Sequence, residues 1–90
     1  MKTYTHIVFG RVQGVGFRYH VHKLAVELGL VGGIFRNQDD GSVYIAISGQ
    51  EQALELFVDR VNHEKLGFAK VVSVKVDRSE KPILSTFKIQ

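Results

Sequence analysis

A glycine-punctuated segment that ends in an arginine is the part of this sequence best suited to chemistry. It runs from Gly10 to Arg18 and reads Gly-Arg-Val-Gln-Gly-Val-Gly-Phe-Arg. Glycines let the main chain approach a ligand closely, and the first amides of a helix lack intrahelical acceptors and lie at the positive end of the helix dipole. The Arg18 guanidinium adds a planar set of donors that matches phosphate oxygens. We therefore expect a cradle for an oxyanion between a strand and a helix.

Two common nucleotide motifs are absent from this segment. Gly10, Gly14 and Gly16 do not have the G-x-G-x-x-G spacing of dinucleotide-binding proteins, and no Gly-Lys-Ser/Thr follows for a P-loop. We expect no nucleotide cofactor.

The periodicity of apolar residues predicts the elements that position the cradle. Val21, Leu24, Ala25 and Leu28 form a helical stripe, and Gly29 suits the end of that helix. The other predicted elements are strands over 3–12 and 30–36, a turn at 39–41, a strand over 43–47, a helix over about 50–63, and strands over 72–76 and 86–89.

This order, strand-helix-strand-strand-helix-strand with a short extra strand, is typical of an α+β ferredoxin-like split βαβ sandwich. We expect an antiparallel sheet with both helices on one face, and a single domain over residues 1–90. Six phenylalanines are assigned to the core rather than to a stacking surface: Phe9, Phe17, Phe35, Phe57, Phe68 and Phe87. The fold hosts enzymes and binding modules alike, so function must come from the site.

Composition narrows the classes of partner. The chain has 90 residues, 44% of them apolar, and no cysteine, which excludes disulfides and thiolate sites and favours the cytoplasm. No apolar run is long enough to span a membrane. The net charge of +3 is spread without a block of like charge, so we expect no nucleic-acid or membrane partner. We also expect a monomer.

Two motifs together resemble the acylphosphatase family. The first is the segment Gly10 to Arg18, which fits the family string G-[RK]-V-Q-G-V-x-[FY]-R at nine consecutive positions. The second is Gly33-Ile34-Phe35-Arg36-Asn37, followed by the Asp39-Asp40-Gly41 turn. The resemblance covers most of the chain and implies one acylphosphatase-like domain over 1–90.

The resemblance implies a metal-independent hydrolase without a cofactor. Its substrates are acyl phosphates, which it cleaves to a carboxylate and inorganic phosphate, the latter both product and inhibitor. Arg18 and Asn37 would be the catalytic residues, with Asn37 positioning the attacking water. The implied phosphate-binding residues are Gln13, Gly14, Val15, Gly16, Phe17 and Arg18.

The second motif differs from the family pattern in its spacing. Arg18 to Asn37 is one residue longer than expected, and Val31 to Gly33 is the simplest place for the extra residue. If that residue lies in the turn before the strand, Asn37 can face Arg18. If it lies within the strand, Asn37 points to the other face, because a one-residue slip reverses every side chain.

Several alternatives stay open at this level. Asn37 could serve only as a turn residue, and the same cradle could belong to a non-catalytic module that binds phosphate. An RNA-binding ferredoxin-like domain is a third possibility, although the RNP1 pattern is absent. His20 and His22 point in different directions on the helix, so no histidine metal site is expected, and Asp39 and Asp40 are assigned to the turn.

Overall fold

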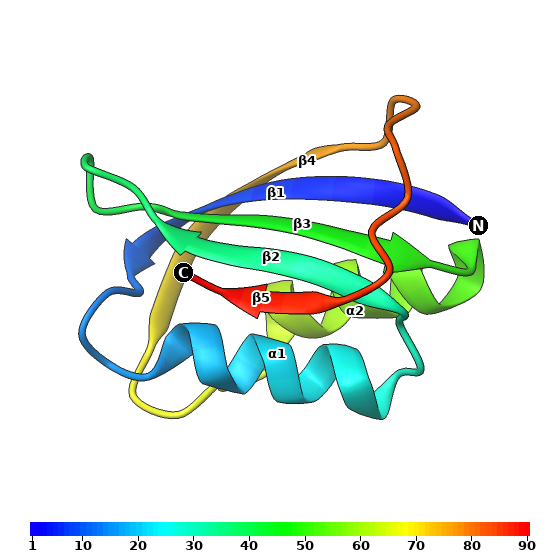
Figure 1. Cartoon of the computed structure of the whole chain (residues 1–90). Coiled ribbons are helices and arrows are strands. Elements are labelled where there is room, and N and C mark those ends of the chain that lie inside the picture. The colour runs from blue at the N-terminus through cyan, green and yellow to red at the C-terminus, as the bar shows by residue number, and fades with distance from the viewer.

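The computed structural model describes residues 1–90, whose elements follow the predicted order (Figure 1). Helix α1 ends where expected, with Gly29 just beyond it at φ +76°. Neither helix is long and apolar enough to cross a membrane. The elements are β1 (Lys2–Arg11), α1 (Phe17–Glu27), β2 (Gly32–Asn37), β3 (Val43–Gly49), α2 (Glu51–His63), β4 (Lys70–Asp77) and β5 (Phe87–Ile89).

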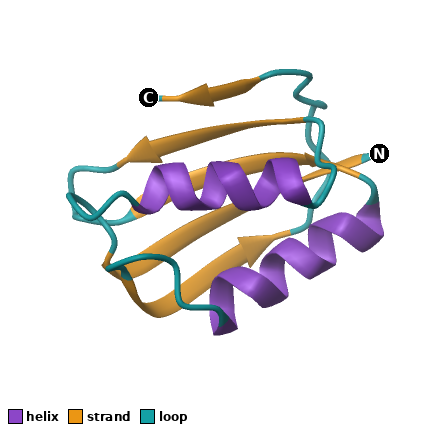
Figure 2. Cartoon of the chain, turned by 90° about the horizontal axis from the view of Figure 1, so that it is seen from below, coloured by secondary structure: helices purple, strands orange, loops and turns teal.

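The strands form one sheet in the order β4-β1-β3-β2-β5, with both helices on one face (Figures 1 and 2). The predicted ferredoxin-like fold is confirmed. One detail of the prediction is wrong, because β5 pairs with β2 in parallel, whereas the other pairs are antiparallel. The connection over residues 78–86 crosses the sheet at the end where β2 begins, so β5 starts at that end and runs parallel to β2 (Figure 1).

Strand alternation separates a helix-covered face from an open face. On β1, Tyr4, His6 and Val8 are buried beneath the helices, and on β3 Ile45 and Ile47 are buried on the same side. The helices contribute their predicted apolar stripes to this core. The helical core residues are Phe17, Val21, Leu24 and Ala25 of α1 and Leu54, Phe57 and Val61 of α2.

Two apolar residues, one in the predicted 72–76 strand and one assigned to the core, lie on the surface. Val72 is 73% exposed because the pairing of β1 with β4 shifts register between Phe9 and Gly10, which leaves Val72 without a partner. Phe68 is 87% exposed in the loop between α2 and β4, so its assignment to the core is wrong. Phe9 is half-buried on the open face and lies outside the core, so its assignment is wrong too. Phe17, Phe35 and Phe57 are buried as predicted, and Phe87 packs against the core.

His6 is an unusual polar residue within the core. The ring is fully buried, lies edge-on to Phe57 with ring centroids 5.3 Å apart, and has no hydrogen-bond partner at either nitrogen. Burial, with a smaller contribution from the positive charge of Arg78, lowers its pKa from 6.5 to about 4. The neighbouring main chain of Ile45 and the charge of Glu55 act in the opposite direction. The folded protein therefore keeps His6 neutral.

This burial predicts a loss of stability in mild acid. Between the folded and unfolded pKa values the unfolded chain binds more protons, so the free energy of unfolding falls as the pH drops below about 6.5. At about pH 5 the loss from His6 is about 2 kcal/mol. Urea unfolding at about pH 7.5 and pH 5 should show this loss in the wild type and much less in His6→Leu. Equal losses in the two proteins would contradict the assignment.

Candidate active site

The segment from Val12 to Gly16 forms the loop between β1 and α1. Val12 and Phe17 are each 1% exposed and fix the ends of the loop in the core. Between them, Gly14 and Gly16 take the left-handed conformation, with φ of +73° and +76°. Only glycine adopts this conformation readily, so the two residues let the loop turn sharply into α1. Gly16 is the N-cap of α1 and supplies no side-chain cap.

The main-chain amides from Gln13 to Tyr19 donate to no group of the protein. The first hydrogen bond of α1 runs from the His20 amide to the Gly16 carbonyl, 3.2 Å away, and no earlier loop amide finds an acceptor. No acidic side chain occupies the first turn of α1 either. A run of free amides at the positive end of a helix dipole binds anions. The loop has the donors of the expected cradle.

Arg18 extends from α1 to the edge of the sheet. Its guanidinium donates to the main-chain carbonyl of Gln90, and the Gln90 amide donates to the Phe35 carbonyl at 2.8 Å. Gln90 follows β5, which pairs with β2. The Arg18 guanidinium therefore lies near the end of β2 that leads to Asn37. No sequence pattern points to Gln90, because its role depends on the parallel pairing of β5.

Asn37 is the last residue of β2 and lies on the helix-covered face. It is two residues after Phe35, which is fully buried against that face, and β2 pairs with β3 without a register shift from Gly32 to Asn37. The strand therefore contains no inserted residue, and Asn37 is on the same side of the sheet as α1 and Arg18. Its Oδ1 atom is buried without a hydrogen-bond partner. Buried amide oxygens in proteins are normally paired, so this atom is free to accept from water or a ligand.

Gln13 joins the cradle to the β2–β3 turn. Its side-chain amide donates to the carbonyls of Gln38 at 2.7 Å and Ser42 at 2.9 Å. These residues flank the turn that follows Asn37. The sequence pattern placed Gln13 in the cradle but did not reveal this contact, because it depends on the hairpin lying beside the loop.

The turn itself is built as predicted. Asp40 accepts from the Ser42 amide at 2.9 Å and the Ser42 hydroxyl at 2.5 Å, and these bonds hold the pKa of the Asp40 carboxyl below its usual value. Gly41 completes the turn with φ of +91°. No three histidine, aspartate or glutamate side chains are grouped to hold a metal ion.

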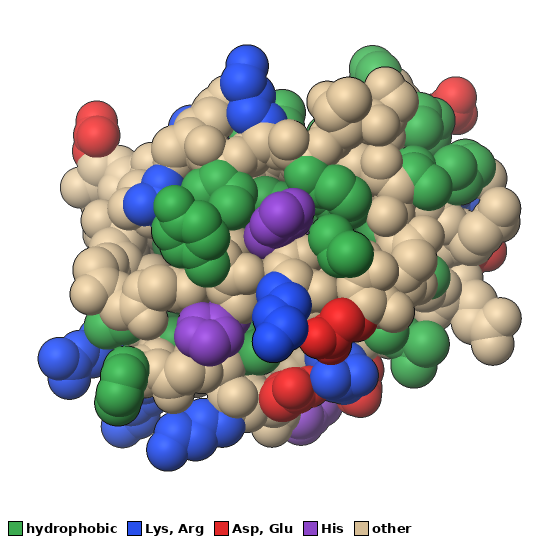
Figure 3. Space-filling model, turned by 60° about the horizontal axis from the view of Figure 1, so that its bottom comes forward, with side chains coloured by type: hydrophobic (Ala, Val, Ile, Leu, Met, Phe, Trp, Pro, Cys, Tyr) green, Lys and Arg blue, Asp and Glu red, His purple; other side chains and the backbone are tan.

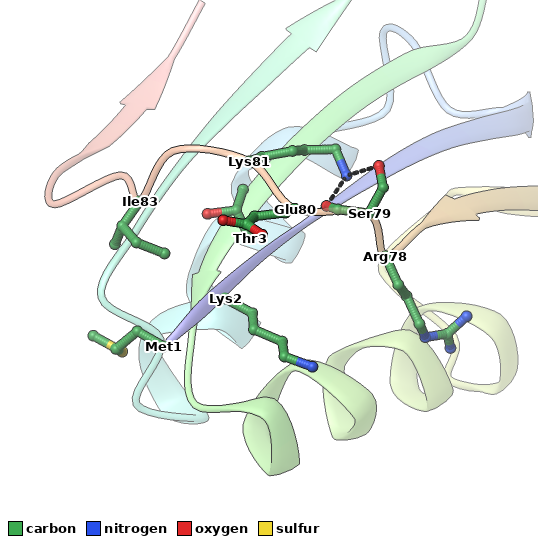
Figure 4. A pocket seen from close by; sticks show the side chains of 8 residues that line it. All are labelled: Met1, Lys2, Thr3, Arg78, Ser79, Glu80, Lys81 and Ile83. Carbon is green, nitrogen blue, oxygen red and sulfur yellow. Dashed lines mark hydrogen bonds between the residues drawn. The ribbon is translucent and has the colours of Figure 1, made fainter.

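A cavity lies at the opposite end of β1 from the cradle. It has a volume of about 430 Å³ and is lined mostly by polar and charged side chains from the start of β1 and the 78–86 segment (Figure 4). Lys2 pairs with Glu51 at 2.8 Å, and Arg78 binds Glu55 through two contacts of 2.8 and 2.9 Å. Lys81 donates to the Ser79 carbonyl at 2.7 Å. The Lys2–Glu51 pair connects β1 to α2, and the Arg78–Glu55 contacts connect the 78–86 segment to α2.

Comparisons with known proteins point to one family. Residues 4–89 match the family model described as Acylphosphatase. An acylphosphatase of Ligilactobacillus salivarius is 48% identical over 83 residues, which cover 92% of this chain and 89% of that protein. The crystal structure of acylphosphatase from Bacillus subtilis superimposes with a TM-score of 0.82 at 42% identity, over 97% of both chains. An acylphosphatase from Coxiella burnetii gives a TM-score of 0.88 at 28% identity, over 99% of this chain and 92% of that one.

Fold and comparisons together define a hydrolase built on a ferredoxin-like sandwich. The chain belongs to the acylphosphatase family, and the substrate that the family implies is an acyl phosphate.

The Gln13 contact generates a prediction about stability. Gln13→Ala removes two hydrogen bonds and should lower the free energy of unfolding by about 1–2 kcal/mol, since both carbonyls keep another donor. Gln13→Glu should lower it further at neutral pH, because a carboxylate would face two carbonyl oxygens. Urea unfolding measures both. Gln52→Ala, at an exposed glutamine of α2, is the control. A Gln13→Glu protein as stable as the wild type would contradict the proposed contact.

Proposed function

We propose that this enzyme hydrolyses acyl phosphates by binding the phosphoryl group in the Gln13–Arg18 cradle and directing a water molecule from Asn37. The observation that carries the proposal is that two sets of polar groups without hydrogen-bond partners lie at the same end of the sheet. The amides of the cradle have no acceptor, and the buried Asn37 Oδ1 has no donor. An anion with an adjacent water satisfies both.

The cradle suits the charge of the transferring phosphoryl group. The free amides and the Arg18 guanidinium would bind its non-bridging oxygens, on which charge is spread in a loose transition state. Arg18 supplies a planar pair of donors, and its contact with Gln90 holds the guanidinium at the edge of the sheet before substrate binds. The α1 dipole adds positive potential at the same place.

Asn37 suits the role of orienting the nucleophile. Its Oδ1 would accept a hydrogen bond from water, placing the water oxygen opposite the bond to the acyl oxygen. In the reaction that we propose, the water oxygen forms a bond to phosphorus while the bond between phosphorus and the acyl oxygen breaks. The leaving carboxylate takes the electron pair, and the water proton passes to a phosphoryl oxygen. A carboxylate is a good leaving group, so no strong acid or base is required.

A direct assay tests the reaction. The purified protein should hydrolyse acetyl phosphate and benzoyl phosphate in the presence of EDTA, with competitive inhibition by inorganic phosphate. Phosphate binding by calorimetry without turnover of either substrate would instead favour the non-catalytic anion-binding module. A cytoplasmic location and a monomeric state stay predictions from the sequence.

Arg18 should be required for both binding and turnover. Arg18→Ala should lower kcat/KM by about 10³-fold or more and weaken inhibition by phosphate, since it removes donors to the phosphoryl group. Arg18→Lys keeps the charge but loses the planar fork, so it should recover only part of the activity. Lys23→Ala removes an exposed cation from the same helix and serves as the control. Full activity in a folded Arg18→Ala protein would refute the site.

Asn37 should affect turnover rather than phosphate binding. Asn37→Ala should lower kcat by about 10²-fold or more, because the water loses its acceptor, while the inhibition constant for phosphate stays close to that of the wild type. Steady-state kinetics with phosphate as inhibitor separate the two effects. If Asn37→Ala weakens phosphate inhibition as strongly as turnover, Asn37 binds the phosphoryl group instead of orienting water.

A further inference from the structure

The sheet face opposite the helices gathers cations that are far apart in the sequence. Strand alternation and register place five of them on this face or at its edge: Arg11, Arg36, Lys70, Lys75 and Lys88. None forms an ion pair, whereas Lys2, Arg60, Arg78 and Lys81 all do. The one acidic side chain in these strands, Asp77, lies 3.4 Å from Lys81. The open face is therefore a surface of unneutralised positive charge.

Aromatic rings lie between these cations. One row across the sheet reads Lys75, Ile7, Tyr44 and Arg36, each directly opposite the next on a neighbouring strand. The Arg36 guanidinium carbon lies 4.8 Å from the centre of the Tyr44 ring, and the Lys75 ammonium lies 5.8 Å from that of Phe9. The middle of the face is thus apolar and aromatic, with a cation over each ring.

Only one end of this face is covered. The 78–86 segment packs over the start of β1, where the Thr3 hydroxyl donates to the Pro82 carbonyl at 2.8 Å and the Leu84 amide donates to the Ser48 hydroxyl at 2.9 Å (Figure 1). Beside it a cavity of about 250 Å³ is lined in part by Thr5, Ile34 and Tyr44. The platform of Ile7, Phe9, Tyr44, Arg36 and Lys75 therefore continues into a recess.

The helical side of the molecule has a different charge pattern. In part of that surface acidic and basic side chains lie next to one another (Figure 3), as in the Arg60–Glu64 pair of α2. The gathering of cations on the open face is not visible in the sequence, where these residues are scattered.

We propose that the open sheet face binds single-stranded nucleic acid, with bases stacking on Tyr44 and Phe9 and phosphates contacting Arg36, Lys75 and their neighbouring cations. Stacking platforms within a positive surface are the common means of binding single strands without sequence readout. A four-stranded sheet with exposed aromatics uses the same geometry to bind RNA. Arginine planes also stack on bases, so Arg36 over Tyr44 extends the platform. An acidic peptide would match the charge but would leave the rings without a stacking partner.

Mapping the bound strand tests the location of this site. Amide shifts are followed by NMR during titration with a uridine octamer, with saturating inorganic phosphate present to fill the cradle. Shifts at Ile7, Phe9, Tyr44 and Lys75 are expected. Shifts confined to residues 13–19 and Asn37, or no shifts, would overturn the proposal. Polyglutamate that binds the same residues as tightly as the octamer would overturn it in favour of an acidic protein partner.

Matched double variants test the charge. Arg36→Ala/Lys75→Ala should weaken binding of a labelled octamer about tenfold or more, and should reduce the slope of log K against log salt by about 1.4. Lys23→Ala/Lys65→Ala removes the same charge from the helical side and should change the affinity less than about twofold. Equal effects of the two double variants would show that the octamer is attracted by net charge alone, and would refute a binding site on the open face.

A third variant tests stacking separately from charge. Tyr44→Leu keeps an apolar side chain but should weaken binding about fivefold or more. Unchanged affinity would overturn the assignment of bases to Tyr44. All these variants should hydrolyse acetyl phosphate at the wild-type rate, which would show that they are folded. A loss of nucleic-acid binding at the open face would then be independent of the proposed catalytic site.

Discussion

The continuous pairing of β1 with β3 and of β3 with β2 fixes the side of the sheet on which each side chain lies. Because side chains alternate along a strand, a slip of one residue would exchange the two faces. In the observed register Tyr4, Val8 and Ile45 meet the helices. The same register brings Asn37 to the side of Arg18 and leaves Tyr44 and Arg36 on the open side. Core, site and surface thus depend on one set of main-chain hydrogen bonds.

The main elements were predictable because their signals are local. The apolar stripes of the helices, the turn at Asp40 and Gly41 and the glycines before α1 each encode structure within a few neighbouring residues. The contacts that complete the site are not local. Gln13 reaches the hairpin across 25 residues of sequence, and Arg18 reaches Gln90 across 72. The register shift that exposes Val72 likewise arises between strands, so no pattern within β4 predicts it.

The ambiguity over Asn37 illustrates what the structure adds to a motif. Sequence spacing allowed two outcomes, with Asn37 either facing Arg18 or pointing away. Regular pairing of β2 with β3 leaves the strand without a bulge, and the burial of Phe35 identifies the face to which Asn37 belongs. The motif match therefore identified Asn37 as a candidate, but the strand pairing determined the face of the sheet on which it lies.

The free amides of the cradle also link the binding of an anion there to the stability of the fold. Their arrangement exists only in the folded chain, so an anion that binds them adds RT ln(1 + [L]/Kd) to the free energy of unfolding. For the proposed enzyme, inorganic phosphate would then stabilise the folded state and inhibit the reaction as a product through the same contacts. The phosphate concentration around the protein would set a balance between the lifetime of the folded enzyme and the fraction of it free to work.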